Sequence, residues 1–206
     1  MKNKIELLGI YGSDFSHAMS AWTSTSREMT EEKEKRVPAL LKMLADNGHL
    51  TPFEKSSLHF LVTSEIASHI HALKHRIGVS INGESARYKE LKGDKYYIPE
   101  DWPEHEKQLL QNHCIRSLEN YHSALTRLTP ILGRKRAKES ARFYLPYATQ
   151  IDYDIMFNMR SFIHFVGLRR TDGAQVEIKD IAQEMLDLVK GTGQFTETLK
   201  AFKLCD

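Results

Sequence analysis

The chain has 206 residues, enough for one domain with a substantial core, and its 41% hydrophobic and 27% charged residues are an ordinary globular composition. The formal net charge of +2 is too small to indicate bulk binding to nucleic acid. Cys114 and Cys205 are too few for a disulfide framework or a zinc site, so we expect two reduced thiols. We find no apolar run typical of a signal peptide or a membrane span, and we expect a cytoplasmic protein with no membrane partner.

The first part of the chain shows two strand patterns and two helix patterns. Residues 5–11 form a short apolar run that predicts a strand. Pro38 opens a predicted helix that ends at the Asn-Gly pair of residues 47–48. Alternating apolar residues over 58–62 predict a second strand, and we expect Ser64 to cap the helix that follows it.

The rest of the chain continues in irregular order. Hydrophobic periodicity fades over residues 74–88, which we expect to form a loop. Apolar residues at three- and four-residue spacing over 110–128 predict a long amphipathic helix, and a basic helix follows from about Arg134. Residues 151–157 alternate again and predict another strand. Two helices complete the prediction, one over residues 161–168 and one that carries Ile178, Ile181, Met185 and Val189.

These elements lack a regular βαβ rhythm, so the pattern favours the α+β class. We predict one domain over residues 1–206, with a mixed sheet flanked by helices, because no repeat or linker divides the chain. His69, His71 and His75 lie at helical spacing and invite a metal site. No acidic or cysteine partner completes such a site in the sequence, so we predict no metal.

The segment from Lys74 to Tyr88 is the most informative part of the sequence. It combines four groups that are or can become cationic with hydroxyl and amide donors, and its two glycines allow the backbone to approach a ligand. Arginine side chains match phosphate oxygens in a bidentate way. The segment therefore reads as a binding loop for phosphorylated ligands. The residues alone also allow a solvated basic loop with ordinary turn glycines.

Family resemblance favours the binding loop. The segment is similar to the signature of flavin-dependent thymidylate synthases, in which Arg-His-Arg is followed by Ser-x-Asn-x-x-Ser-x-Arg-Tyr. Three further stretches resemble the same family in order and spacing. These are His-Leu-Thr-Pro-Phe-Glu at residues 49–54, Arg-Phe-Tyr-Leu-Pro at 142–146, and a block from Asn158 to Glu177 that includes Arg169.

The signature is not matched completely. Lys74 replaces the first arginine of the signature, which keeps the positive charge but loses the ability of a guanidinium to donate two parallel hydrogen bonds. One extra residue lies between Arg76 and Ser80, and the usual Asn-Glu pair becomes Asn-Gly-Glu at residues 82–84. His164 stands where the family often has asparagine. These departures concern local geometry more than the overall chemistry.

The resemblance implies a role for each matched residue. Arg169 is the expected catalytic residue, because a fixed cation against the uracil ring favours the N3-deprotonated form, in which C5 is more nucleophilic. His49 and Tyr88 are expected on the folate side of the active site. The implied dUMP ligands are His71, Lys74, Glu84, Ser85, Arg87, Arg142 and Arg169. The implied FAD ligands are Thr51, Lys74, His75, Arg76, Asn82, Asn158, Arg160 and His164.

The family implies conversion of dUMP to dTMP, with methylenetetrahydrofolate as the one-carbon donor and NADPH-reduced FAD as the hydride source. It also implies a homotetramer with active sites where subunits meet. The sequence has no Pro-Cys nucleophile segment and no Gly-x-Gly-x-x-Gly fingerprint, so neither a cysteine mechanism nor a Rossmann unit is expected. Two alternatives stay open: a related flavin and folate enzyme with another C5 product, such as hydroxymethyl, and a helical module that binds nucleic acid through its basic loop.

Overall fold

We describe the protein from a computed structural model, of which residues 1–85, 87–91 and 95–205 are described. Residue 86, within the loop expected over 74–88, lies outside the described residues. Contacts between residues divide the chain into two compact units, and each is described by itself. The α4 unit comprises Met1–Lys4, Val62–Ala72 and Asn82–Tyr153, and the α5 unit comprises Ile5–Leu61, Leu73–Ile81 and Asp154–Asp206.

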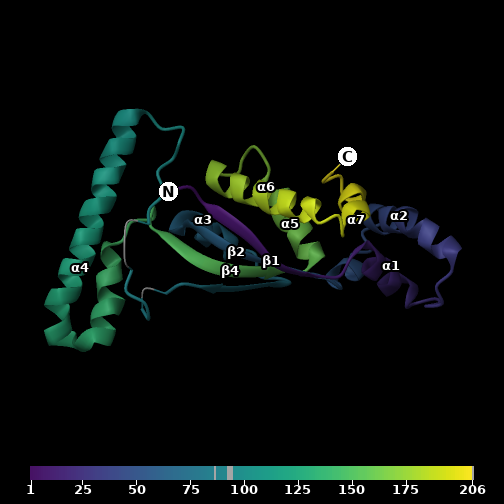
Figure 1. Ribbon diagram of the computed structural model, residues 1–206, viewed down its shortest axis with the longest axis horizontal. Helices are drawn as coiled ribbons and strands as arrows, with labels where there is room; N and C mark the ends of the chain where they lie inside the picture. Colours follow the sequence, from purple (N-terminus) through teal and green to yellow (C-terminus); the bar gives the residue numbers. More distant parts are fainter. Residues whose placement is uncertain (86, 92–94, 206) are drawn as a thin grey trace. The chain divides into compact units, whose positions relative to one another are not determined.

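Four strands form one sheet in the order β1-β2-β4-β3 (Figure 1). Their bounds are β1 Lys4–Tyr11, β2 Ser57–Glu65, β3 Val79–Gly83 and β4 Gln150–Phe157.

The sheet is antiparallel throughout. The N–H of Glu84 donates to the carbonyl of Asp152 at 2.7 Å, and the N–H of Asn158 donates to the carbonyl of Gly78 at 3.0 Å, so β3 and β4 run in opposite directions. The α+β class is confirmed, but the expectation of a mixed sheet is wrong. Strands β2 and β3 run the same way, yet β4 lies between them, so no two neighbours among these strands are parallel.

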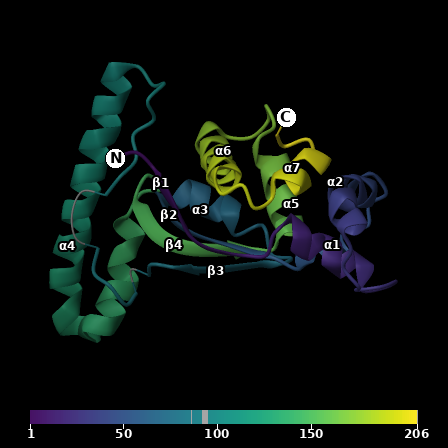
Figure 2. The same cartoon turned by 45° about the vertical axis from the view of Figure 1, so that its right-hand side comes forward.

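The α4 unit contains α3 (Ile66–Ala72), α4 (Glu104–Ala141) and the 3-10 helix η2 (Arg142–Tyr144). Helix α4 is broken at Gly133, which has a φ of 75° and a ψ of 153°, a conformation open to a residue without a Cβ. The chain reverses there, so the two arms of α4 lie side by side (Figures 1 and 2). Ala137 of the second arm shares a buried cluster with Tyr121 and Leu125 of the first. The basic helix expected from about Arg134 is this second arm.

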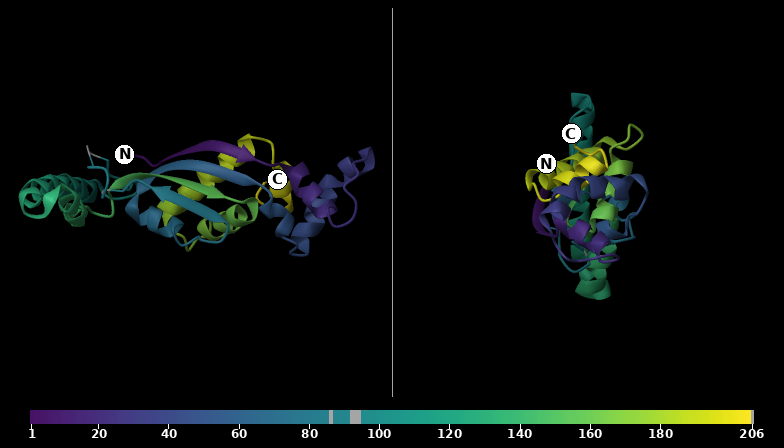
Figure 3. Two further views of the ribbon diagram at one scale, coloured as in Figure 1. Left: turned by 90° about the horizontal axis from the view of Figure 1, so that it is seen from below. Right: turned by 90° about the vertical axis from the view of Figure 1, so that its right-hand side faces the viewer.

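The α5 unit contains the remaining helices and an aromatic core. Phe60 of β2 stacks on Phe162 with ring centroids 5.8 Å apart, and Phe157 of β4 lies 5.1 Å from Phe165. In Figure 3, α5 and α6 lie against one face of the strand segments of this unit. This packing fixes α5, the helix that supplies nearly half of the residues lining the site described below. The bounds are α1 Asp14–Trp22, α2 Glu31–Asp46, η1 Thr51–Glu54, α5 Met159–Arg169, α6 Val176–Gly191 and α7 Thr196–Ala201.

Three local predictions are wrong in detail. Helix α2 begins at Glu31 rather than at Pro38, because Thr30 accepts a hydrogen bond from the Lys33 N–H and acidic residues follow in the first turn. Ser64 lies within β2 and does not cap α3; the carboxylate of Glu65 accepts from the Ser68 N–H instead. The expected loop over 74–88 contains the edge strand β3.

Within the described parts of the chain, no helix combines the length and the apolar character that a membrane span requires.

Candidate active site

A cavity of about 690 Å³ lies within the α5 unit. Cationic and apolar side chains share its walls, which suits a large ligand with an anionic part and a flat apolar part. Most of the walls come from the segment 74–79 and from helix α5. The lining residues are Leu50, Lys74, His75, Arg76, Ile77, Val79, Arg160, Ser161, Ile163, His164, Leu168, Arg169 and Phe202.

Two motifs that lie far apart in the sequence meet at this cavity. One is the cationic start of the signature segment and the other is the block on helix α5. The predicted site residues that the structure brings together here are Lys74, His75, Arg76, Arg160, His164 and Arg169.

Gly78 lies in the stretch between Arg76 and Ser80 that holds the extra residue of the signature segment. Its φ of 66° is a left-handed conformation, and a Cβ built on it would lie 2.4 Å from both Asn158 Nδ2 and Ser161 Oγ. Asn158 caps α5 by accepting from the Ser161 N–H at 2.8 Å, and the Ser161 hydroxyl donates to the carbonyl of Ile77 at 2.6 Å. The segment before β3 is therefore fastened to the N-terminus of α5. Asn158, predicted to contact flavin, has this structural role.

His75 and Arg169 contact each other directly. The Nε–H of Arg169 donates to Nε2 of His75 at 3.0 Å. The His75 ring also meets Phe165 edge-on, at 5.0 Å between centroids, and lies 6.0 Å from the His164 ring. Burial, and then the charges of Arg169 and His164, lower the pKa of His75 to about 4. At neutral pH the site thus contains a neutral imidazole beside a guanidinium.

The stretch around Thr51 lies at another wall of the same cavity. Leu50 lines the cavity, whereas His49 and Thr51 on either side of it are exposed and do not line it. Glu54, at the end of η1, accepts from Arg160 at 2.7 Å and so holds that arginine at the cavity. The sequence gives no role to Glu54, although it belongs to the stretch that resembles the family.

The predicted dUMP ligand Arg87 lies in the α4 unit and is docked on the second arm of α4. Its Nε donates to Glu139 at 2.6 Å, and its guanidinium lies 5.4 Å from the Tyr88 ring. Lys138 donates to the carbonyl of Tyr88 at 2.8 Å. Because Glu139 lies three residues before Arg142, both predicted ligands, Arg87 and Arg142, lie at the C-terminal end of α4. Arg142 is exposed.

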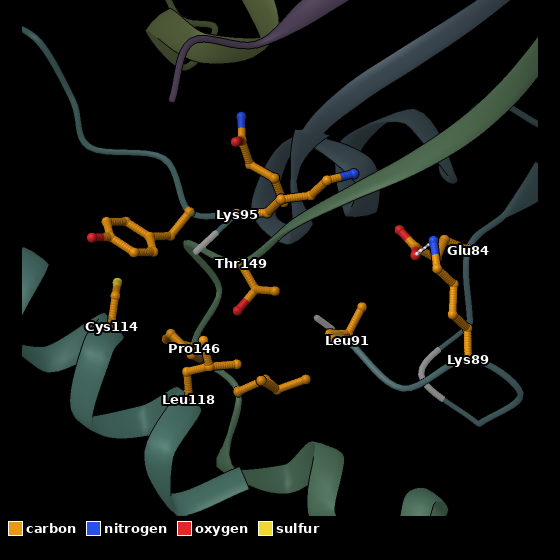
Figure 4. A pocket seen from close by; sticks show the side chains of 11 residues that line it. Glu84, Lys89, Leu91, Lys95, Cys114, Leu118, Pro146 and Thr149 are labelled. Carbon is orange, nitrogen blue, oxygen red and sulfur yellow. Dashed lines mark ion pairs between the residues drawn. The ribbon is translucent and has the colours of Figure 1, made fainter. Parts of the chain in front are cut away.

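Glu84 lies at a smaller cavity of the α4 unit, about 150 Å³ in volume. Its carboxylate forms an ion pair with Lys89 at 2.6 Å, drawn as a dashed line in Figure 4. A carboxylate oxygen of Glu84 also accepts from the N–H of Asp152 at 3.3 Å. Cys114 lines this cavity from α4, and burial raises the pKa of its thiol, which favours the unreactive protonated form.

Asp152 anchors the segment before α4. Its carboxylate accepts from Thr63 at 2.7 Å and from Lys95 at 2.9 Å. Burial raises the pKa of Asp152, but the Thr63 hydrogen bond and Lys95 outweigh it, so the pKa lies below the ordinary value.

The remaining predicted residues also lie in the α4 unit. Asn82 is exposed on β3, and the carbonyl of Ser85 accepts from the Tyr88 N–H at 3.0 Å in a turn. His71 is half-buried near the end of α3. The His69 ring lies 4.6 Å from the Tyr153 ring, tilted by 57°, and burial lowers the pKa of His69.

No cluster of three or more His, Cys, Asp or Glu side chains suited to a metal ion occurs among the residues for which the structure gives positions. The sequence reasoning missed the apolar walls of the larger cavity. Ile163 and Leu168 lie within a matched block and could have been inferred from it, but Phe202 lies outside every motif.

The fold and the cavity define an antiparallel α+β protein with a cationic binding site. The family model described as thymidylate synthase complementing protein matches residues 7–192. The flavin-dependent thymidylate synthase of Thermosipho africanus is 31% identical over 92% of this chain and 86% of its own length. That of Pseudothermotoga lettingae is 29% identical over 93% and 87%. The chain belongs to this family.

The fold is also similar to that of solved structures. The crystal structure of a UMP/dUMP methylase, PolB from Streptomyces cacaoi, bound with 5-Br dUMP, has a TM-score of 0.79 and 27% sequence identity. The match covers 98% of this chain and 95% of that one. The resemblance read from the sequence is thus confirmed, and so is the expected class of enzyme, a methyltransferase.

Proposed function

We propose that this chain converts dUMP to dTMP, taking the one-carbon unit from methylenetetrahydrofolate and the hydride from FAD reduced by NADPH. The observation that carries the proposal is the meeting of the segment 74–76 with Arg160, His164 and Arg169 around one cavity. It is supported by the names of the relatives and by the likeness to a dUMP methylase.

The donor set of the cavity fits FAD. A dinucleotide flavin carries two phosphates and a flat ring system, and the cavity offers Lys74, Arg76 and Arg160 together with apolar walls such as Ile163 and Leu168. We assign these residues, with His75 and His164, to flavin binding. Asn158 and Thr51, also predicted flavin residues, belong to the same unit but do not line the cavity, so their proposed part is to support it. Asn82, which lies in the α4 unit, stays a predicted flavin residue.

For the nucleotide we propose the residues at the end of α4. Arg87 and Arg142 are a pair of cations suited to a phosphate dianion, and the Ser85 hydroxyl adds a donor. His71, Lys74 and Glu84 are proposed as further dUMP contacts, and His49 and Tyr88 as folate-side residues. Arg169 is proposed as the catalytic residue that favours the electron-rich form of the uracil ring. These roles rest on the family resemblance.

We also propose a homotetramer with active sites at subunit interfaces. Exposed apolar side chains in the α4 unit support it. Phe143 is 80% exposed, Ile131 74% and Tyr147 68%, which is unusual for large apolar residues in a free surface. Light scattering of the purified protein tests this directly, and a monomer would refute it.

The test of the function begins with the visible spectrum of the purified protein supplied with FAD. Flavin bands that bleach with NADPH, and dTMP formed from dUMP and methylenetetrahydrofolate, are the expected results. Arg169→Ala should lower turnover on the order of 100-fold, whereas the neighbouring Arg170→Ala should not. A protein that takes up no FAD and binds oligonucleotides in a strongly salt-dependent way would favour a nucleic-acid module instead.

A second candidate concerns the substrate. The similar crystal structure is that of a UMP/dUMP methylase, which favours testing UMP beside dUMP. Chromatography of the products separates these outcomes, and it also separates a methyl from a hydroxymethyl group at C5.

A further inference from the structure

We propose that Phe202 forms a wall of the flavin site, where its ring contacts one of the flat rings of the dinucleotide. The segment 195–204 that carries Phe202 is then part of the cofactor site, although the match to the family model ends at residue 192. This inference rests on the proposed binding of FAD in the larger cavity.

Phe202 reaches this cavity from outside the motifs that resemble the family. Its side chain is half-buried and lines the cavity, so part of the ring is packed and part is accessible to a ligand. Among the described residues that line the cavity it supplies the one phenyl ring. Like all the others, it belongs to the α5 unit. Aromatic side chains favour flat ring systems as partners.

A second aromatic ring supports Phe202 from the side of the core. The Phe53 ring meets it edge-on, with centroids 4.9 Å apart and an angle of 81° between the planes. Phe53 is itself fully buried, 5.2 Å from the His17 ring, and is not one of the residues that line the cavity. The Phe202 ring is thus held by the core and presented to the cavity.

The C-terminal end of α7 fixes the direction of Phe202. This residue is the C-cap of the helix, and Lys203 after it has a left-handed φ of 57°. The N–H of Lys203 donates to the carbonyl of Lys200 at 2.9 Å, and the N–H of Leu204 donates to the carbonyl of Leu199 at 2.9 Å. This pair of hydrogen bonds is a Schellman motif, which satisfies the last carbonyls of a helix and sets the path of the chain beyond it.

The N-terminal end of α7 is anchored as well. The carboxylate of Asp14 accepts from the N–H of Glu197 at 2.8 Å and from the N–H of Thr198 at 2.7 Å, which satisfies donors of the first turn. Helix α7 also packs against α2 of the same unit (Figure 1). Phe202 therefore lies on an element that is held at both ends.

The 3-10 helix η1 supports a cation and an aromatic ring of the cavity together. Phe53 packs against Phe202, and the next residue, Glu54, accepts from Arg160 at 2.7 Å. Arg160 and Phe202 both line the cavity. In FAD a sugar-derived chain joins each flat ring system to the pyrophosphate. A ring wall and a guanidinium supported by one turn suit such a pair of groups.

The experiment measures dissociation constants by calorimetry for FAD, for FMN, which lacks the adenine, and for ADP, which lacks the flavin. Phe202→Leu keeps an apolar side chain but removes the flat ring, whereas Phe202→Tyr keeps the ring. The matched control is Phe15→Leu, because Phe15 on α1 is 43% exposed and does not line the cavity. Urea unfolding establishes that each variant is folded.

We expect Phe202→Leu to raise the dissociation constant of FAD on the order of 3- to 10-fold, because an aromatic contact is lost. Phe202→Tyr and Phe15→Leu should bind FAD like the wild type. A parallel loss for FMN assigns the flavin ring to Phe202, and a parallel loss for ADP assigns the adenine. Unchanged binding of FAD in Phe202→Leu, or an equal loss in Phe202→Tyr, overturns the proposal.

A second measurement does not depend on the stability of any substituted protein. The wild type is labelled with para-fluorophenylalanine, and the fluorine resonance of Phe202 is identified by its absence in Phe202→Leu. It should shift when FAD is added, whereas the resonance of Phe15 should not. Uptake of FAD without a shift at Phe202 refutes this inference and leaves the proposed flavin site standing. A protein that binds none of the three probes refutes the proposed function, and the inference with it.

Discussion

His17 is a fully buried histidine that should make the stability of the protein depend on pH. It lies on α1, with Nδ1 3.0 Å from Thr198 Oγ1 and Nε2 2.9 Å from Ser56 Oγ. Its ring lies between Phe53 at 5.2 Å and Phe195 at 5.5 Å. Neither hydroxyl can neutralise an imidazolium, and burial lowers the pKa of His17 from 6.5 to about 4.

The magnitude follows from linkage between protonation and folding. Because the pKa is lower in the folded than in the unfolded state, the unfolded chain takes up the proton first as the pH falls. The stability tied to neutral His17 is therefore complete above pH 6.5 and is lost progressively down to about pH 4. At about 1.4 kcal/mol per pH unit, the loss over this window is on the order of 3 kcal/mol.

Urea unfolding of the wild type and of His17→Gln, at a series of pH values from about 7 to about 4.5, measures this loss. At pH 7 the wild type should be more stable by about 2 kcal/mol, because the variant disturbs two buried hydrogen bonds. The difference should shrink or reverse towards the acid end, since glutamine does not titrate. Other histidines, such as His69, contribute to both proteins and cancel. A difference in the free energy of unfolding that stays constant across the series would refute the reasoning.

Three further predictions concern the segments that carry the site. Gly78→Ala should lower the free energy of unfolding by about 1–3 kcal/mol and weaken FAD binding, because residue 78 has a left-handed φ and a Cβ there would lie 2.4 Å from its neighbours. The control is Gly173→Ala, where a Cβ would meet no atom within 4 Å, and this variant should have the melting temperature of the wild type. Arg87→Lys should raise the dissociation constant of dUMP about tenfold in calorimetry, because a lysine cannot donate the two parallel hydrogen bonds of a guanidinium. The control Arg127→Lys should leave this dissociation constant unchanged. Asp152→Asn should lower the free energy of unfolding by about 1 kcal/mol at pH 7. Because the pKa of Asp152 lies below the ordinary value, this difference between variant and wild type should shrink as the pH drops through the acid range. A difference that persists at acid pH would contradict this reasoning.

Most of the fold was predictable where hydrophobic pattern and local capping agree. The strands β2 and β4 and the helices α5 and α6 lie where the sequence pattern predicts them, because each buries one continuous apolar face. Strand β1 lies where the short apolar run predicts it, although its residues are only half-buried or exposed. Helices α1 and α7 were missed. Both are short, and they are held by long-range contacts, such as the N–H of Thr198 donating to Asp14, that periodicity does not reveal.

The candidate site also has a part that could be predicted from the sequence and a part that could not. The meeting of the segment 74–76 with Arg169 follows from the family resemblance, since both belong to matched motifs. The hydrogen bond between His75 and Arg169, and the support of Arg160 by Glu54, depend on side-chain geometry across more than ninety residues of sequence. Residue types at given spacings do not determine such contacts. The roles proposed for the dUMP and folate residues stay predictions.

The break in α4 at Gly133 has a consequence for the order of folding. The two arms bring Tyr121 and Leu125 against Ala137 and Ala141, partners separated by fewer than about twenty residues. Contacts this close in sequence cost little chain entropy to form, whereas β1 must find β2 across some fifty residues. The backbone amides in the two arms of α4 should therefore become protected from hydrogen exchange early during refolding, before those of the sheet. The segment that carries Arg87 can then pack against a helix pair that is already formed.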